Sequence, residues 1–223
     1  MHIYECQDGT KVPSVTTILK VLGNESITKW ANYLGFKHID YERELNRYAD
    51  RGTSLHTCLQ HVVDPSLWGD DHPITFNSIE DERFCEGAVK KFNDVMEDYP
   101  YTTIFTERTF ISKTLGYGGT LDWYAEMSGK KMINDFKSSK QVRMKHLIQI
   151  GGYKNLLEEE GYHVDGGSII IANPMVCKLY PVDKETLDLL GELFNRIKFV
   201  YDQIEGPLPQ LNTDLLNAIK KES

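Results

Sequence analysis

Three hydrophobic stretches rich in β-branched and aromatic residues follow one another with only short links between them. They span residues 103–111, 119–127 and 131–137. Strands joined by such short links pair side by side in antiparallel fashion, because a parallel pair needs a long crossover. The sequence therefore predicts an antiparallel meander, and the rest of the chain must pack against it.

Segments with helical periodicity or turn signals surround the predicted meander. Helices are predicted at residues 15–22, 27–33, 42–49, 54–63, 79–97, 144–160, 184–204 and 214–221, and two further hairpins pair residues 2–6 with 11–13 and 168–172 with 176–182. Arg51-Gly52-Thr53 is expected to break the helical pattern, so that Thr53 caps a new helix with His56 in its first turn. Trp30, on a short helix, is expected to belong to the core rather than to a base-stacking surface.

Length and composition indicate an ordinary globular protein. A chain of 223 residues with 40% hydrophobic and 26% charged residues supports one substantial core. We expect a single domain over residues 1–223, mainly helical to residue 100, with the sheet and its helix at 101–182 and further helices from 183. No basic segment precedes an apolar run at the N-terminus, and no stretch reaches membrane-spanning length. The expectation is a soluble, cytoplasmic or otherwise intracellular protein.

Polar side chains gather around the end of the third stretch, Met132 to Lys140. Alternation along a strand places Asp135 and Lys137 on one face. Asp122 ends the sequence Gly119-Thr120-Leu121-Asp122 on the preceding strand, and a later helix carries Gln149 and Tyr153 on a shared face. An Asp and a Lys two apart on a strand are commonly a surface ion pair of little consequence. The order of the pieces favours a functional site instead.

That order resembles the PD-(D/E)XK nuclease superfamily, and within it the RecB-like group, which includes mitochondrial and phage exonucleases. The matching pieces are Pro13-Ser14-Val15-Thr16-Thr17-Ile18-Leu19, Arg51-Gly52-Thr53-Ser54-Leu55-His56, Gly119-Thr120-Leu121-Asp122, Ile133-Asn134-Asp135-Phe136-Lys137 and Gln149-Ile150-Gly151-Gly152-Tyr153. The resemblance covers roughly residues 12 to 160. It implies a restriction-endonuclease-like αβββαβ core with an N-terminal helical wrap.

The resemblance also implies the roles of individual residues. Asp122, Asp135 and Lys137 would be catalytic. A Mg²⁺ or Mn²⁺ ion would be held by His56, Asp122, Asp135 and the backbone carbonyl of Phe136. Gln149 and Tyr153 would contact the nucleic acid and shape the site. Glu107, on the first stretch, could add a further ligand, although an exposed strand acid is the simpler interpretation.

Charge and cysteine distribution refine these expectations. The net charge is −8, yet residues 130–145 hold six lysines and arginines against the single acid Asp135, which suits a narrow nucleic-acid channel. We expect Lys140, Arg143 and Lys145 to bind nucleic acid there. The four cysteines are scattered, with no CxxC pair, so neither zinc nor disulfides are indicated. Some RecB-like nucleases hold an iron–sulfur cluster through grouped C-terminal cysteines, which this chain lacks, so none is expected.

The resemblance thus implies a hydrolase, a metal-dependent DNA exonuclease that prefers single-stranded ends or flaps, as in DNA repair or recombination. Two alternatives stay open. One is a catalytically silent nuclease-fold module that binds nucleic acid or protein. The other is an endonucleolytic or RNA-cleaving relative with the same motifs.

Overall fold

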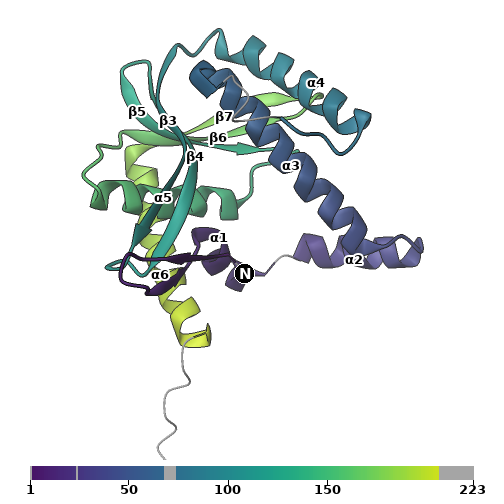
Figure 1. The fold of residues 1–223 in the computed structure, drawn as a ribbon. Coiled ribbons are helices and arrows are strands. Elements are labelled where there is room, and N and C mark those ends of the chain that lie inside the picture. Colours follow the sequence, from purple (N-terminus) through teal and green to yellow (C-terminus); the bar gives the residue numbers. More distant parts are fainter. Residues whose placement is uncertain (1, 24, 68–73, 206–223) are drawn as a thin grey trace, which may run out of the picture.

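The computed structural model describes residues 2–23, 25–67 and 74–205 (Figure 1). Its helices and strands are, in chain order, β1 (Ile3–Glu5), β2 (Lys11–Pro13), α1 (Val15–Ile18), α2 (Glu25–Phe36), α3 (Tyr41–Val63), α4 (Ile79–Met96), β3 (Tyr101–Ser112), β4 (Tyr117–Met127), β5 (Lys130–Lys137), α5 (Met144–Glu159), β6 (Gly166–Ala172), β7 (Cys177–Asp183) and α6 (Lys184–Glu205). The helix predicted at 214–221 lies outside the described residues. Within those residues, no helix combines the length and the apolar character needed to cross a membrane.

A mixed five-stranded sheet of order β3-β4-β5-β6-β7 forms the centre of the fold. Neighbouring strands are antiparallel except for β5 and β6, which are parallel. Parallel neighbours need a crossover connection, and α5 supplies it. The predicted meander and the general α/β class are confirmed. The predicted N-terminal hairpin is confirmed as the separate pair of β1 and β2.

Helices cover both faces of this sheet. α1, α5 and α6 pack against one face, and α3 and α4 pack against the other (Figure 1). The first face buries Tyr117, Ile150 and Phe194, and the second buries Phe92 and Trp123. Each such large apolar side chain contributes roughly 1.5–3 kcal/mol when fully buried. Because both faces are covered, β4 and β6 are buried along nearly their whole length.

Two glycines let α5 approach α6 closely. A Cβ at Gly151 would lie 2.5 Å from the backbone carbonyl carbon of Leu190, and a Cβ at Gly152 would lie 2.9 Å from the ring of Phe194. Any larger side chain would force the helices apart. The contact fixes the helix that carries Gln149, whose role is described below.

α3 is one continuous helix of 23 residues, so the predicted break at Arg51-Gly52-Thr53 is wrong. Thr53 caps no new helix. Its hydroxyl donates to the carbonyl of Ala49 at 3.2 Å, a bond within the helix that keeps a polar residue in helical conformation. Glycine inside a helix costs only about 1 kcal/mol, which packing of the helix on the sheet outweighs. His56 therefore lies in the middle of a long helix and not in a first turn.

Candidate functional site

The candidate site lies where β4 and β5 separate. Their ladder ends at the pair Trp123–Asn134, while β5 continues to pair with β6 as far as Lys137. Beyond that pair the backbone N–H of Phe136 donates to Oδ2 of Asp122 at 2.8 Å. The N–H and C=O of one strand residue point to the same side, so the Phe136 carbonyl faces this opening too. The predicted backbone ligand and a predicted carboxylate thus share one gap.

β3 and β4 are distorted at the same level of the sheet. Glu107 has a φ of 44°, the only positive φ in any described strand. In β4, Leu121 joins one core and Trp123 the other, although strict alternation would place both on the same face. Alternation therefore breaks at Asp122, and the flanking strand pairs place Glu107 opposite it. The distortion brings these two carboxylates to the open end of the sheet.

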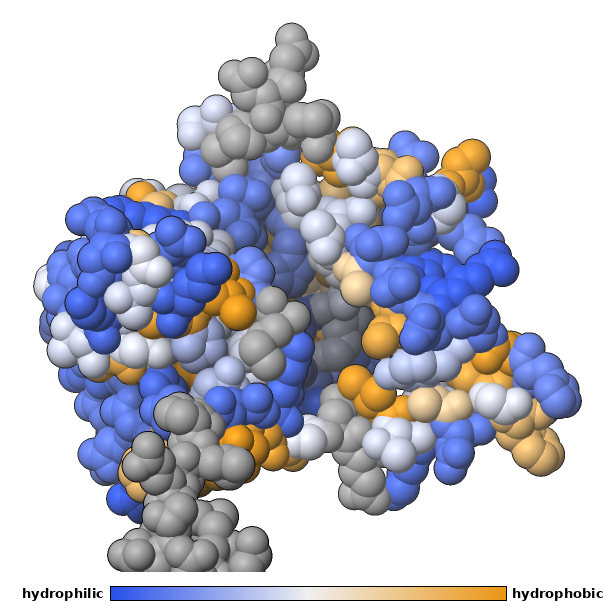
Figure 2. Space-filling model, turned by 60° about the horizontal axis from the view of Figure 1, so that its bottom comes forward, coloured by the Kyte–Doolittle hydropathy of each residue, from blue (hydrophilic) through white to orange (hydrophobic). Residues whose placement is uncertain are grey.

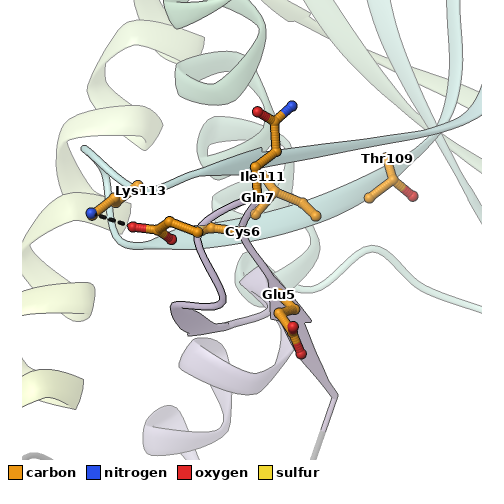
Figure 3. A pocket seen from close by; sticks show the side chains of 7 residues that line it. Glu5, Cys6, Gln7, Thr109, Ile111 and Lys113 are labelled. Atoms are coloured by element: carbon orange, nitrogen blue, oxygen red, sulfur yellow. Dashed lines mark hydrogen bonds and ion pairs between the residues drawn. The ribbon is translucent and has the colours of Figure 1, made fainter.

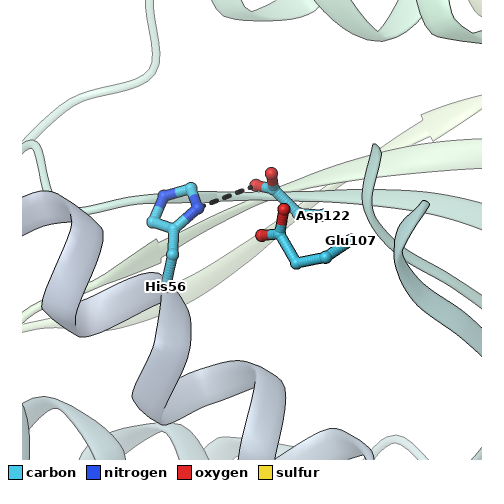
Figure 4. A group of neighbouring side chains, drawn as sticks. All are labelled: His56, Glu107 and Asp122. Atoms are coloured by element: carbon cyan, nitrogen blue, oxygen red, sulfur yellow. Dashed lines mark ion pairs between the residues drawn. The ribbon is translucent and has the colours of Figure 1, made fainter. Parts of the chain in front are cut away.

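His56 completes a group of three side chains that could hold a metal ion (Figure 4). α3 carries its imidazole to the sheet, where Nδ1 lies 3.4 Å from Oδ2 of Asp122. One ligand atom from each of His56, Glu107 and Asp122 lies within 4.8 Å of the other two. The three side chains line an open hollow of about 470 Å³. One imidazole nitrogen beside carboxylate oxygens suits Mn²⁺, and also Mg²⁺.

Asp135 is the most deeply buried carboxylate of the site, with no exposed surface. Nζ of Lys137 forms an ion pair with its Oδ2 at 2.5 Å, as expected for two residues on one face of β5. Gln149 donates one hydrogen bond to Oδ1 of Asp135 at 3.1 Å and another to the Tyr153 hydroxyl at 2.8 Å. Among the described residues, no hydrogen bond of good geometry reaches Oδ2.

The predicted contact of Tyr153 with nucleic acid is wrong, because its side chain is only 4% exposed and packs in the core beneath the sheet. Gln149 is 8% exposed and is directed at Asp135. The two residues therefore hold Asp135 in place from α5.

The carboxyl groups respond differently to their surroundings. Burial raises the pKa of Asp135 to about 6, an effect that Lys137 opposes and Asp122 strengthens. Glu107 has an exposed side chain, yet desolvation of its carboxyl group by the surrounding atoms, followed by the nearby Asp122 carboxylate, raises its pKa to about 7. Burial alone would also raise the pKa of Asp122, but His56 and Lys137 outweigh it, so that pKa is lowered. Asp122 is thus the carboxylate that stays ionised most readily.

The two basic groups are stabilised in their charged forms. Burial alone would lower the pKa of His56, but the Asp122 carboxylate raises it. Burial alone would likewise lower the pKa of Lys137, and Asp135 with Asp122 raises it. Lys137 therefore stays an ammonium at neutral pH. The three carboxyl groups of the site, those of Glu107, Asp122 and Asp135, make it attractive to a divalent cation.

The basic residues between positions 130 and 145, expected to line a nucleic-acid channel, fall into two groups. Lys137, Lys140, Arg143 and Lys145 lie at or beyond the end of β5 that carries the site. Arg143 and Lys145 line a hollow with Lys137 and Gln149. Lys130 and Lys131 lie at the other end of the strand, about 20 Å away at roughly 3.3 Å per residue. Only the first group therefore lies close enough to the site to bind a nucleic acid there.

A separate hollow lies between the N-terminal hairpin and the outer strand β3 (Figure 3). Glu5, Cys6 and Thr109 line it. Two of its charged groups, Asp8 and Lys113, already form an ion pair at 2.5 Å. It contributes nothing to the site at Asp122.

Glu107 is the site residue that sequence reasoning undervalued. It is exposed, as the simpler interpretation held, yet it also lies within ligand spacing of His56 and Asp122. The turn between β3 and β4 could have located it, since counting outward from the turn places Glu107 opposite Asp122. The count requires the turn centre to be known to the residue.

Comparisons with known proteins give little. No protein-family model matches the chain, and no curated protein matches it. Among solved structures, the crystal structure of SSO0001 is similar with a TM-score of 0.33 and 16% identity. The match covers 57% of this chain and 63% of SSO0001, so it spans less than two thirds of that protein. Similarity at this level assigns neither fold nor function.

Proposed function

We propose that the chain is a metal-dependent DNA exonuclease that hydrolyses phosphodiester bonds at single-stranded ends or flaps. The observation that carries the proposal is the meeting of Asp122, Asp135 and Lys137 at the opening between β4 and β5. The order α4-β3-β4-β5-α5-β6 also supports it, because it matches the αβββαβ core of the nucleases that the motifs resemble. The preference for ends rests on that resemblance alone.

The groups at the opening fit a Mg²⁺ or Mn²⁺ ion. Asp135 presents a fully buried carboxylate paired with Lys137, and ligand atoms of His56, Glu107 and Asp122 lie within 4.8 Å of one another. The ion would be held by His56, Asp122, Asp135 and the Phe136 carbonyl, with Glu107 as an additional ligand. When bound, such an ion neutralises charge on the phosphate and lowers the pKa of a bound water.

Lys137 supplies the positive charge that belongs to the chain itself. Its ammonium is held 2.5 Å from Asp135 on the part of β5 that pairs with β6. It would donate a hydrogen bond to the attacking water or to a non-bridging phosphate oxygen. Either bond stabilises the charge that develops as water oxygen bonds to phosphorus and the bond from phosphorus to the leaving sugar oxygen breaks. Losing one such donor costs on the order of 10²-fold in rate.

Gln149 acts as a positioning residue. Its amide holds Oδ1 of Asp135, which leaves Oδ2 directed toward Lys137. Tyr153 in turn accepts the second amide hydrogen and fixes the orientation of Gln149. A hydrogen bond that orients a metal-binding carboxylate usually contributes roughly 10- to 100-fold to metal affinity or activity.

The test is degradation of end-labelled DNA by the wild type, Asp135→Asn and Lys137→Ala. Single-stranded, duplex and circular substrates would each be incubated with Mg²⁺, Mn²⁺ or EDTA. Lys131→Ala is the matched control, because it removes an exposed lysine from the far end of the same strand. We expect metal-dependent loss of linear single strands but not of circles, abolished by the two site substitutions and unchanged by the control.

Cleavage of circular DNA would show that the enzyme is an endonuclease and not an exonuclease. Absence of cleavage under either metal, with the protein folded by circular dichroism, would refute the proposal and favour a silent binding module.

A further inference from the structure

An aromatic surface faces basic residues across a hollow beside the site. The hollow has a volume of about 540 Å³ and lies between the α2–α3 arm, meaning α2 and the first half of α3, and the segment that joins β5 to α5. The arm contributes Ile27, Trp30, Leu45 and Tyr48, and the opposite wall contributes Lys140 and Arg143. Figure 2 shows the molecule hollowed between its main body and a smaller lobe, where hydrophobic atoms gather near the hollow.

The aromatic side chains of the arm are not part of either core. Trp30 is half-buried and Tyr48 is 50% exposed, so the expected core position of Trp30 is wrong. The Trp30 ring instead meets the rings of Tyr41 and Tyr48 edge-on, with centroids 5.6 and 5.7 Å apart. Leu45 beside them is 37% exposed. An apolar surface of this kind beside polar residues is typical of a binding site.

The positive charge of the hollow comes from the wall opposite the arm. On the arm, Arg47 is paired with Glu44 at 2.8 Å and Arg51 with Asp81 at 2.6 Å, so these guanidinium groups are already neutralised. Across the hollow, Lys140 has no carboxylate within salt-bridge distance among the described residues. One wall thus offers aromatic faces and edges, and the other offers positive charge.

The hollow shares lining residues with two others that lie beside Lys137. Arg143 lines both this hollow and the neighbouring one that contains Lys137 and Gln149. Tyr48 and Lys140 also line a third hollow that reaches Ser138, the residue after Lys137. A chain of nucleotides lying along the aromatic wall would therefore lead to Asp135 and Lys137.

We infer that this hollow binds an unpaired nucleic-acid strand, with bases stacked on Trp30 and Tyr48 and phosphates at Lys140 and Arg143. The inference rests on the proposed function and extends it by naming what selects the substrate. Base stacking on aromatic side chains needs exposed base faces, which a duplex hides within its own stack. A duplex could reach the basic wall but not the aromatic one. Trp30 and Tyr48 are thus the residues that discriminate unpaired from paired strands.

Equilibrium binding measured by fluorescence anisotropy in EDTA tests this inference without any cleavage. The probes are a labelled 20-nucleotide DNA strand, the duplex of the same sequence, and a strand of equal length in which every nucleotide lacks its base. We expect the wild type to bind the intact strand at least about 10-fold more tightly than the other two probes, because only the intact strand offers base faces.

Variants assign the two walls. Trp30→Ala and Tyr48→Ala should each weaken binding of the intact strand roughly 5- to 150-fold and leave binding of the baseless strand unchanged. Lys140→Ala should weaken both strands alike and lower the salt dependence of binding by about 0.7. Phe199→Ala is the matched control, since it removes an exposed aromatic ring from α6, away from the hollow.

Loss of ring packing could disturb the arm, so Trp30→Phe and Tyr48→Phe are measured as well. Both retain a ring and should restore most of the binding. Thermal unfolding of each variant, followed by circular dichroism, checks that the protein is folded. Equal affinity for intact and baseless strands, or unchanged binding by both alanine variants, would overturn the inference. If cleavage of DNA persists in that case, only the inference has failed. If aromatic-dependent binding is seen and no substrate is cleaved, the proposed activity has failed instead.

Discussion

Proton competition at the carboxyl groups gives the sharpest test of the metal site. A metal ion binds ionised carboxylates and neutral imidazole, so protons on Asp135, Glu107 and His56 compete with it. The pKa of Asp135 is raised to about 6 and that of Glu107 to about 7. For acids with raised pKa values, the protonated form dominates below that pKa, and metal affinity falls as pH drops through it. We therefore predict weaker Mn²⁺ binding at pH 6 than at pH 8.

The size of the effect follows from the two pKa values. At pH 6, Glu107 is ionised in roughly one molecule in ten and Asp135 in roughly half. At pH 8 both are almost fully ionised. If both bind the ion, the apparent affinity should fall about 20-fold between pH 8 and pH 6. The raised pKa of His56 adds to the loss in the same direction.

Isothermal titration calorimetry with MnCl₂ at several pH values measures this dependence directly. Repeating each titration in buffers of different ionisation enthalpy counts the protons released. Glu107→Gln is the informative variant, because it removes the group with the highest carboxyl pKa of the site while keeping the shape of the side chain. In that variant the part of the loss due to carboxyl groups should shrink to about 2-fold, the share of Asp135.

Two results would contradict the reasoning in different ways. An affinity independent of pH, without proton release, would mean that no group with a raised pKa binds the ion. The same pH dependence in wild type and Glu107→Gln would remove Glu107 from the ligand set and leave the other ligands in place.

Three further predictions follow from the geometry of the site and its support. The raised pKa of Asp135 means that the wild type loses stability as pH rises from 4 to 8, whereas Asp135→Asn does not. In urea unfolding of the metal-free protein, the free energy of unfolding of Asp135→Asn should therefore gain roughly 2–3 kcal/mol relative to wild type over this range. A difference that stays constant with pH would contradict this. Gly151→Ala should destabilise the fold by more than about 1–3 kcal/mol in the same assay, while Gly35→Ala, with nothing within 4 Å, should not destabilise it. Gln149→Ala should lower kcat roughly 10- to 100-fold with KM nearly unchanged, and Tyr153→Phe should cost less, in steady-state cleavage assays; a change in KM alone would refute the positioning role.

The parts of the fold that were predictable from sequence are those set by local pattern. The meander follows from three short-linked hydrophobic stretches. α4 begins at Ile79 as predicted, and Ser78 caps it, with its hydroxyl accepting from the N–H of Asp81 at 3.1 Å. The pairing of Asp135 with Lys137 follows from strand alternation in the same way. Each of these features depends on residues within a few positions of one another.

The parts that were not predictable depend on contacts made far along the chain. Gly52 looked like a helix break, yet α3 continues through it because the helix packs on the sheet and α4. Glu107 faces Asp122 only in one register, and a shift of one residue in the turn would have turned it away. Burial of Tyr153 depends on Gly119, where any Cβ would lie 2.6 Å from its ring. Neither the register nor that contact has a local signature.

Three unfavourable features coincide at one level of the sheet. Glu107 adopts a left-handed backbone conformation, the β4–β5 ladder ends after Trp123–Asn134, and the fully buried Asp135 carboxylate has Lys137 as its only ion-pair partner among the described residues. Each costs of order 1–3 kcal/mol, and elsewhere the two cores pack the sheet tightly. A sheet selected for stability alone would pair these strands and place apolar residues at positions 107 and 135. A cation held between Asp122, Asp135 and Glu107 would offset the buried negative charge, and the gap between β4 and β5 would give it room to bind. The strand distortion and the three carboxylates are therefore best explained together.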